Sequence, residues 1–476
     1  MSEPDFDDEI PYSASFPLPF RVLALAGMGI LGWATNLHGL DKFGIDAPIV
    51  LELRTNDSLP RTTPRRENFR LGTQAPSSHY KTIYRLAGLY FSWFFGTWTI
   101  YLFFTQRDPK VVDVYGFLPG LLTVAIILVL LCPFEVMYKH ERDSFILSLR
   151  RCLFIRMDSP VYFADVVFAD VLTSYAKVLG DVFLIFRMLY PGNSMLVKPV
   201  DSGWIRWLAP TVMSLPFFLR LRQCVIEWTS SNNESNRPLY NAVKYATAFP
   251  VIFLSAAQNI VESEVRDGRG SEASNGSWHG EHPLFRLWLL AAVVNSLYSY
   301  WWDVSNDWGL HLLKPSELSA KLQPPKRLIL PRLHSGSSLL RPYHSEGIST
   351  ELNGGRYPYG FRAPLLYPIL VYPVMIFLNF VLRMTWTIKL SSHLHSKSDG
   401  SMTFFLIEVA EIFRRWMWVF FRVEWEAIKR AQEKPVGGIS DRGLTEDVVD
   451  YELFPPTPEE VPTTVIGLAP APRGLS

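Results

Sequence analysis

Nine apolar stretches, each about long enough to cross a lipid bilayer, alternate with polar and charged stretches along the chain. A spanning helix needs about 20 largely apolar residues, because the hydrocarbon core is about 30 Å thick and each helical residue rises about 1.5 Å. The apolar stretches cover residues 19–39, 84–104, 115–134, 162–189, 204–226, 240–261, 283–303, 364–388 and 402–422. The pattern predicts an all-α protein, a polytopic transmembrane helical bundle with about nine spans.

The distribution of Lys and Arg between these stretches predicts the orientation of the chain. Loops on the cytosolic side of a membrane tend to carry the positive charge. The segments 40–83, 135–161, 220–238, 304–363 and the tail from 423 contain 28 Lys and Arg residues, against 7 in the segments on the other side. We therefore expect a lumenal N-terminus and a cytosolic C-terminus.

The same pattern divides the chain into four regions. Two cytosolic segments are rich in Pro, Ser and charged residues and lack apolar periodicity, so they are expected to be flexible. The sequon at Asn275 falls in a predicted lumenal loop, where N-glycosylation could occur. The predicted regions are a lumenal segment 1–18, transmembrane helices 19–134 with a cytosolic loop 40–83, a transmembrane core 135–430 with a flexible cytosolic loop 304–363, and a disordered cytosolic tail 431–476.

Composition supports a membrane protein and excludes several other classes. Hydrophobic residues make up 48% of the chain and aromatic residues 14%, which is high for a soluble protein. The formal net charge of +1 gives no indication of nucleic-acid binding. Cys132, Cys152 and Cys224 lie far apart without ligand-like spacing, so no disulfide scaffold, metal site or cofactor is predicted.

Ionisable residues within the apolar stretches are the main candidates for function. A charge in the membrane interior costs several kcal/mol unless it faces a partner or water. In the stretch 162–189, Asp170, Ser174, Lys177 and Asp181 recur at helical spacing on one face, which cannot contact lipid. A further pair of carboxylates, Asp303 and Asp307, lies one turn apart at the end of another stretch.

Four cations on three predicted spans suggest an anion site: Lys244, Arg383, Arg414 and Arg415. Guanidinium groups bind tetrahedral oxyanions through paired hydrogen bonds, and lysine adds a mobile charge. Asp170, Asp303 and Asp307 could accept hydrogen bonds from a protonated phosphate, which favours phosphate over sulfate. The alternative is a purely structural network, in which Glu411 pairs with the arginines of its own helix.

Six short motifs, each present once, follow one another between about residue 160 and residue 430. They are Phe168-Ala-Asp170, Leu221-Arg222-Gln223-Cys224, Asn241-Ala-Val-Lys244-Tyr245, Trp302-Asp303-Val-Ser-Asn-Asp307-Trp-Gly-Leu310, Leu382-Arg383-Met-Thr-Trp386-Thr-Ile388 and Glu411-Ile-Phe-Arg414-Arg415-Trp-Met-Trp-Val-Phe-Phe-Arg422-Val-Glu424. In these motifs the chain resembles the EXS family, which includes SPX-EXS phosphate exporters and a fungal ER-retention-defective subgroup.

The resemblance implies a set of residues that line a phosphate pathway: Asp170, Thr173, Lys244, Asp303, Asp307, Arg383, Trp386, Glu411, Arg414 and Arg415. Thr173 stands where the exporters tend to have asparagine. Further candidates are Arg237, which matches only with a gap of about two residues, Lys177 and Arg222.

One departure from the exporters is large, because fewer than twenty residues precede the first apolar stretch and no SPX domain is expected. This architecture resembles the ER-retention-defective subgroup. The resemblance implies a multi-pass protein of the Golgi membrane, and of the ER membrane as a second location, that returns phosphate released by glycosylation to the cytosol. It also implies a link to retention of ER lumenal proteins and to glycosyltransferase recycling, and a homodimer is a further expectation.

Two alternatives to transport remain open from sequence. The first is a Golgi sorting scaffold that binds a cytosolic adaptor through the tail or the loop 304–363 and transports nothing. The second is an intramembrane enzyme in which Asp303 and Asp307 hold Mg²⁺. Two carboxylates alone make a weak metal site, so we do not expect an enzyme.

Overall fold

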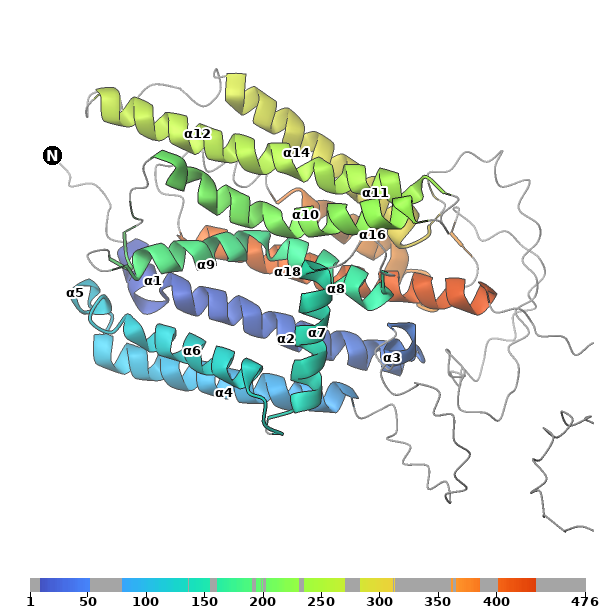
Figure 1. Cartoon of the computed structure of the whole chain (residues 1–476), viewed down its shortest axis with the longest axis horizontal. Helices are drawn as coiled ribbons and strands as arrows, with labels where there is room; N and C mark the ends of the chain where they lie inside the picture. Colours follow the sequence, from blue (N-terminus) through green and yellow to red (C-terminus); the bar gives the residue numbers. More distant parts are fainter. Residues whose placement is uncertain are drawn as a thin grey trace, which may run out of the picture. The chain divides into compact units, whose positions relative to one another are not determined.

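A computed structural model of the chain describes a large part of its residues, and every element among them is a helix (Figure 1). The described residues are 9–51, 79–135, 137–154, 161–190, 194–197, 199, 203–230, 235–269, 283–310, 312, 361–362, 365–385 and 401–433. The predicted all-α class is confirmed for this part of the chain. The tail from residue 434, the loop 313–360 and the predicted glycosylation site Asn275 lie outside it.

The N-terminal helices form a layer along one side of the bundle (Figure 1). They are α1 (Glu9–Ser15), α2 (Leu18–Lys42), α3 (Ala47–Val50), α4 (His79–Thr105), α5 (Pro109–Val112) and α6 (Phe117–Leu131). Helix α2 packs against α4 on one side and against α9 and α18 on the other. Buried aromatic rings fill the contact between α2 and α4, where the centroids of Phe20 and Tyr101 lie 5.2 Å apart.

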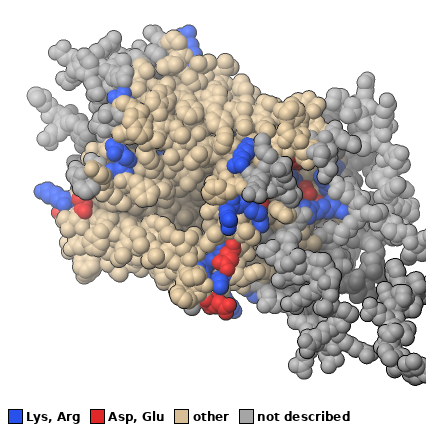
Figure 2. Space-filling model, viewed as in Figure 1, with Lys and Arg blue, Asp and Glu red and all other residues tan. Residues whose placement is uncertain are grey.

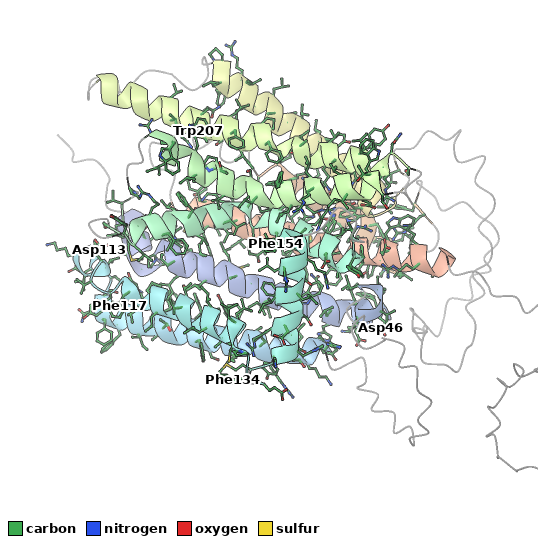
Figure 3. All side chains as sticks on the ribbon, in the orientation of Figure 1. Asp46, Asp113, Phe117, Phe134, Phe154 and Trp207 are labelled. Carbon is green, nitrogen blue, oxygen red and sulfur yellow. The ribbon has the colours of Figure 1, made fainter. Side chains whose placement is uncertain are left out.

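The outer surfaces of α4 and α6 are strongly apolar. Phe103, Leu121 and Leu128 are 75%, 63% and 65% exposed, and Phe117 and Phe134 project at the two ends of α6 (Figure 3). On the face seen in Figure 2, most of the surface of these helices is uncharged. A contiguous apolar surface of this kind is typical of a protein that contacts lipid or another protein.

Among the described helices, α2 is the one whose length and mean hydropathy suffice for a membrane span. Helices α6 and α16 (Val371–Arg383) are apolar but shorter. The prediction of about nine spans and the predicted orientation of the termini therefore remain predictions.

Helix α7 (Lys139–Leu153) lies in the segment 135–161, for which the sequence predicted only a loop, and it runs across the other helices (Figure 1). Contacts of two arginines, the buried Arg142 and the partly exposed Arg151, hold it in place. Arg142 donates to the carbonyl oxygen of Cys132 at 2.8 Å, at the end of α6. Arg151 forms a two-pronged ion pair with Asp165, at 2.7 and 2.8 Å. A polar helix can therefore form here without an apolar pattern, because side-chain charges fix it to its neighbours.

The predicted stretch 162–189 is two helices rather than one, α8 (Phe163–Ser174) and α9 (Ala176–Met188). The break falls at Tyr175, whose hydroxyl donates to the carbonyl oxygen of Leu25 on α2 at 3.1 Å. The stretch 240–261 is also divided, into α11 (Arg237–Ala246) and α12 (Ala248–Arg269). A break of one residue does not change the mean hydropathy of a long apolar stretch, so the sequence pattern did not predict these breaks.

The remaining elements surround the long C-terminal helix. They are a 3₁₀ turn at Gly203–Trp207, α10 (Leu208–Thr229), α14 (Pro283–Trp302), a π-helical turn η4 at Asp303–Asp307, α16 (Val371–Arg383) and α18 (Ser401–Glu433). Helix α18 packs against α2, α8, α16 and η4. The buried rings of α18 form the centre of the main core. There the ring centroids of Phe421 on α18 and of Trp308, which follows η4, lie 4.8 Å apart.

Candidate functional site

Nine charged side chains from six elements meet beside the middle of α18, and we call them the inner cluster. They are Asp170 (α8), Arg220 (α10), Lys244 (α11), Asp303 and Asp307 (η4), Arg383 (α16), and Glu411, Arg414 and Arg415 (α18). All but Arg383 and Glu411 are less than a tenth exposed. The four cations predicted from sequence are therefore drawn to one place instead of pointing to unrelated parts of the bundle.

Asp303 is the centre of the inner cluster and is completely buried. Its Oδ1 accepts a hydrogen bond from Lys244 Nζ at 2.9 Å, and its Oδ2 accepts one from Arg383 Nη2. Nη1 of Arg414 lies 3.5 Å from the same Oδ2. One carboxylate thus draws together cations from three different helices.

The π-helical turn explains why both carboxylates of this segment face inward. The amide N–H of Trp308 donates to the carbonyl oxygen of Asp303 at 2.9 Å, five residues back, which widens the turn. Asp307 then accepts hydrogen bonds from Lys244 at 3.1 Å and from Trp418 at 3.3 Å. Gly309 ends the turn with φ +63°, a conformation that favours glycine.

Asp170 is paired with Arg220, a residue that the sequence analysis did not select. Arg220 Nε donates to Asp170 Oδ1 at 2.9 Å, and the hydroxyl of Tyr245 donates to the same oxygen. Arg220 falls both in the predicted cytosolic segment 220–238 and in the predicted apolar stretch 204–226. Its helical spacing from the buried Gln223 and Cys224 was the signal that could have identified it.

Arg415 differs from the other cations of the inner cluster because it has no acid within ion-pair distance in the described part of the chain. Arg415 is 5% exposed, and its guanidinium donates to two hydroxyls, Ser174 Oγ and Thr173 Oγ1, both at 3.0 Å. It also lies over the ring of Trp418, 4.7 Å from the centroid. The hydroxyl of Ser174 in turn donates to Glu411 at 2.8 Å, which connects Arg415 to the rest of the inner cluster.

Three guanidinium nitrogens of the inner cluster are buried and have no hydrogen-bond acceptor among the described residues: Arg383 Nε, Arg414 Nη1 and Arg415 Nη1. The inner cluster contains five cations and four carboxylates, which leaves one formal positive charge. Buried donors and charges normally have partners, because leaving them without one is costly. One additional anion would balance this charge and would provide hydrogen-bond acceptors for these nitrogens.

A second group of charges lies where α9, α18 and α2 meet, and we call it the outer cluster. Lys177 forms an ion pair with Asp181 on its own helix and lies 3.6 Å from Glu408 Oε1. Arg21 on α2 is close enough to interact electrostatically with both acids. The break at Tyr175 and the turn of the helix separate Lys177 from the inner cluster, although it shares a predicted face with Asp170.

The other candidates from sequence lie elsewhere. Arg237 sits at the edge of the inner cluster, where its guanidinium donates to the carbonyl oxygen of Asn306 at 2.7 Å. Arg222 donates to the carbonyl oxygen of Leu153 at 3.1 Å, and its place in the pathway stays a prediction. Trp386 lies outside the described residues.

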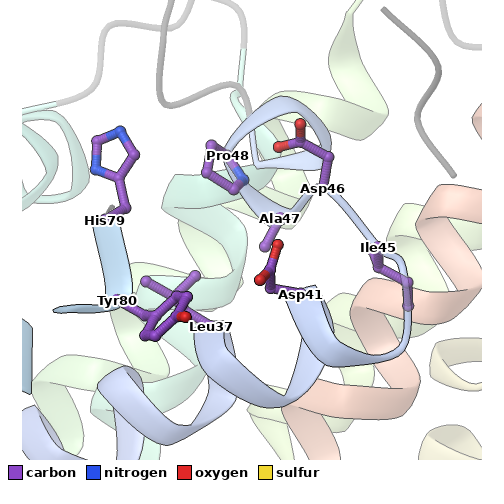
Figure 4. Close-up of a pocket in the computed structure, with 8 residues that line it drawn as sticks. All are labelled: Leu37, Asp41, Ile45, Asp46, Ala47, Pro48, His79 and Tyr80. Atoms are coloured by element: carbon purple, nitrogen blue, oxygen red, sulfur yellow. The ribbon is translucent and has the colours of Figure 1, made fainter. Parts of the chain in front are cut away.

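A surface pocket lies between the end of α2, α3 and the start of α4, apart from both clusters (Figure 4). Its lining includes Asp41, Asp46, His79 and Tyr80. Asp46 accepts a hydrogen bond from the amide of Ile49 at 3.4 Å and so caps α3. Nowhere in the described residues do three or more His, Cys, Asp or Glu side chains form a group that could hold a metal ion.

Comparison with known proteins identifies the family. The model of the EXS family matches residues 16–428, which is most of the chain. The chain belongs to the EXS family. The match includes every helix that contributes to the inner and outer clusters.

Three relatives illustrate the range of the family. "Protein ERD1 homolog 2" of Schizosaccharomyces pombe is 26% identical over 436 residues, which cover 87% of this chain and 97% of that protein. "Protein ERD1 homolog 1" of the same organism is 31% identical over 59% of this chain and 62% of that protein. "Phosphate transporter PHO1" of Arabidopsis thaliana is 24% identical over 88% of this chain but only 43% of its own length. The similarity to the transporter thus covers less than half of that longer protein.

Proposed function

We propose that this protein transports inorganic phosphate across a membrane and that the inner cluster binds the anion. The observation that carries the proposal is Arg415, a buried guanidinium that donates to two hydroxyls and has no described carboxylate within ion-pair distance. A buried cation without a counter-ion is costly. A bound phosphate would pair with Arg415 and would also give hydrogen-bond acceptors to Arg383 Nε and Arg414 Nη1, which have none among the described residues.

The carboxylates of the inner cluster account for phosphate in preference to sulfate. At neutral pH phosphate carries at least one hydroxyl, which can donate a hydrogen bond to Asp303 or Asp307, whereas sulfate would meet only repulsion there. The same carboxylates hold the cations when no anion is bound. Binding then exchanges one set of ion pairs for another, which keeps the affinity low enough for release.

Location and direction are part of the proposal. The similarity to the two ERD1 homologs over much of their length, and to a phosphate transporter, supports a membrane protein of the secretory pathway. We propose that it lies in the Golgi membrane, with the ER membrane as a second location. There it returns phosphate released by glycosylation to the cytosol, and thereby supports retention of ER lumenal proteins. The protein acts as a transporter and not as an enzyme.

Radiolabelled phosphate flux through the purified protein in vesicles tests the proposal. We expect Arg415→Ala to reduce the flux at least about tenfold and Arg415→Lys to keep part of it, since lysine retains the charge but loses the paired hydrogen bonds. The control is Arg85→Ala, an exposed position on α4 outside both clusters. Flux that is unchanged in a folded Arg415→Ala protein would refute the site, and wild-type protein without flux would leave the sorting scaffold as the better interpretation.

A further inference from the structure

Lys177 combines two properties that are unusual for a lysine in an apolar stretch. Its side chain is 45% exposed, yet it lies close to two buried acids, Asp181 and Glu408. Lipid is a poor environment for a charged amine, so an exposed lysine at this depth must face water. The proposal that follows rests on the proposed function, since it places Lys177 within a membrane.

Polar residues continue from the outer cluster to the inner cluster along a single seam, where α18 lies against α8 and α9. On α18, Glu408, Glu411 and Arg415 recur at spacings of three and four residues and share one face. This face meets α8 and α9 through three contacts. Glu408 faces Lys177, Glu411 accepts a hydrogen bond from Ser174, and Arg415 donates to Ser174.

Along this seam, exposure is high at Lys177 and Glu411. It is low at Glu408, which lies between them, and at the residues beyond Glu411. The side chain of Lys177 is 45% exposed, that of Glu411 is 34% exposed, and Arg415 and Asp170 are 5% and 2% exposed. Beyond them, Asp307 is covered by the indole groups of Trp302 and Trp418, at 3.2 and 3.3 Å. The inner cluster is therefore most exposed at Glu411, on the side of Lys177, and less exposed at Asp307, whose side chain is 10% exposed.

We infer that the outer cluster is a second, weaker anion site at the entrance to the pathway, and that Lys177 receives phosphate before it passes to the inner cluster. The amine of Lys177 would leave Asp181 and Glu408 and bind the anion, while these two acids still interact electrostatically with Arg21. Two cations and two acids leave no net charge, so the anion is held loosely and is released inward to Arg414 and Arg415. The predicted orientation places this entrance on the lumenal side.

Accessibility of a cysteine at position 177 tests the location of the entrance without reference to transport. In a Cys132→Ser background, since Cys152 and Cys224 are buried, Lys177→Cys is exposed to a membrane-impermeant anionic thiol reagent from each side of sealed vesicles. We expect modification from the lumenal side, and faster modification than at the control position. The control is Phe186→Cys on the same helix, which is 71% exposed and should face lipid and react slowly. Modification only from the cytosolic side, or no faster than the control, would overturn the inference.

Flux measurements separate an entrance site from a structural lysine. Lys177→Gln should raise the KM for lumenal phosphate about tenfold and change the maximal rate by less than about twofold, while Lys177→Arg restores the KM. A lower maximal rate with an unchanged KM would assign Lys177 to a structural ion pair and overturn the inference. Wild-type protein without flux would instead refute the proposed function, so the two failures are distinguishable.

Discussion

Replacing Asp303 with alanine separates an anion site from a purely structural network. Asp303 is fully buried and is the shared partner of Lys244, Arg383 and Arg414. In Asp303→Ala these cations lose their common counter-charge and stay buried. If the inner cluster binds phosphate, the anion can take the place of the missing carboxylate. If the cluster is only structural, phosphate cannot compensate for the loss.

The expected loss of stability is large. Removing one partner of a buried ion pair costs about 3–5 kcal/mol, because the remaining charge is left without compensation. Since three cations share Asp303, we expect the upper part of that range. At about 2 °C per kcal/mol, the lower end for folded domains, the Tm should fall by about 8–10 °C.

The assay is thermal unfolding of the purified protein in detergent, followed by fluorescence, with and without phosphate at constant ionic strength. A ligand that binds only the folded state adds about 2.7 kcal/mol at a concentration of 100 Kd. We expect phosphate to raise the Tm of Asp303→Ala by more than that of the wild type, because in the wild type the anion competes with Asp303 for the same cations.

The matched control is Asp165→Ala, which removes a buried partner of Arg151 outside the inner cluster. It should also be destabilised, and phosphate should stabilise it no more than it stabilises the wild type. An Asp303→Ala protein as stable as the wild type would refute the idea that Asp303 compensates the cations. Equal stabilisation by phosphate of Asp303→Ala and of the wild type would refute the anion site.

Two further predictions concern residues that only the structure identified. Arg220→Met should lower stability by about 3–5 kcal/mol, because Asp170 loses its ion-pair partner, and adding Asp170→Leu should recover most of the loss. Thermal unfolding of the two variants checks this, and a double variant no more stable than Arg220→Met would contradict it. Gly309→Ala should lower both stability and phosphate flux, because φ is +63° there and a Cβ would meet the ring of Trp425. Normal flux through Gly309→Ala would show that the π-helical turn, and with it the position of Asp307, tolerates this strain.

Sequence alone was sufficient for the helical class and for much of the inner cluster. Charged residues such as Lys244, Asp303 and Arg383 stand in apolar surroundings, where each of them must find a partner. Their presence within predicted spans was therefore enough to expect that they meet. The family resemblance selected the same residues, so the two kinds of inference agreed on the chemistry of the site.

Only the tertiary structure decided which charge pairs with which. Arg220 and Arg222 stand two residues apart, yet α10 turns one toward Asp170 and the other toward the carbonyl oxygen of Leu153. Similarly, Arg414 and Arg415 are neighbours, but Arg414 reaches two carboxylates and Arg415 reaches hydroxyls. The mean hydropathy of a segment includes both arginines of such a pair, so it cannot show which partner each of them contacts.

The sequence by itself determined that this protein is a helical bundle with charges that cannot face lipid, because burial of apolar surface and the cost of isolated charge act on residue type alone. The tertiary structure decided that Lys177 stands apart from the inner cluster and that Asp307 turns inward. Both depend on a break at Tyr175 and a widened turn after Trp302. Such local departures from a regular helix are stabilised by contacts with distant helices, which no local pattern records.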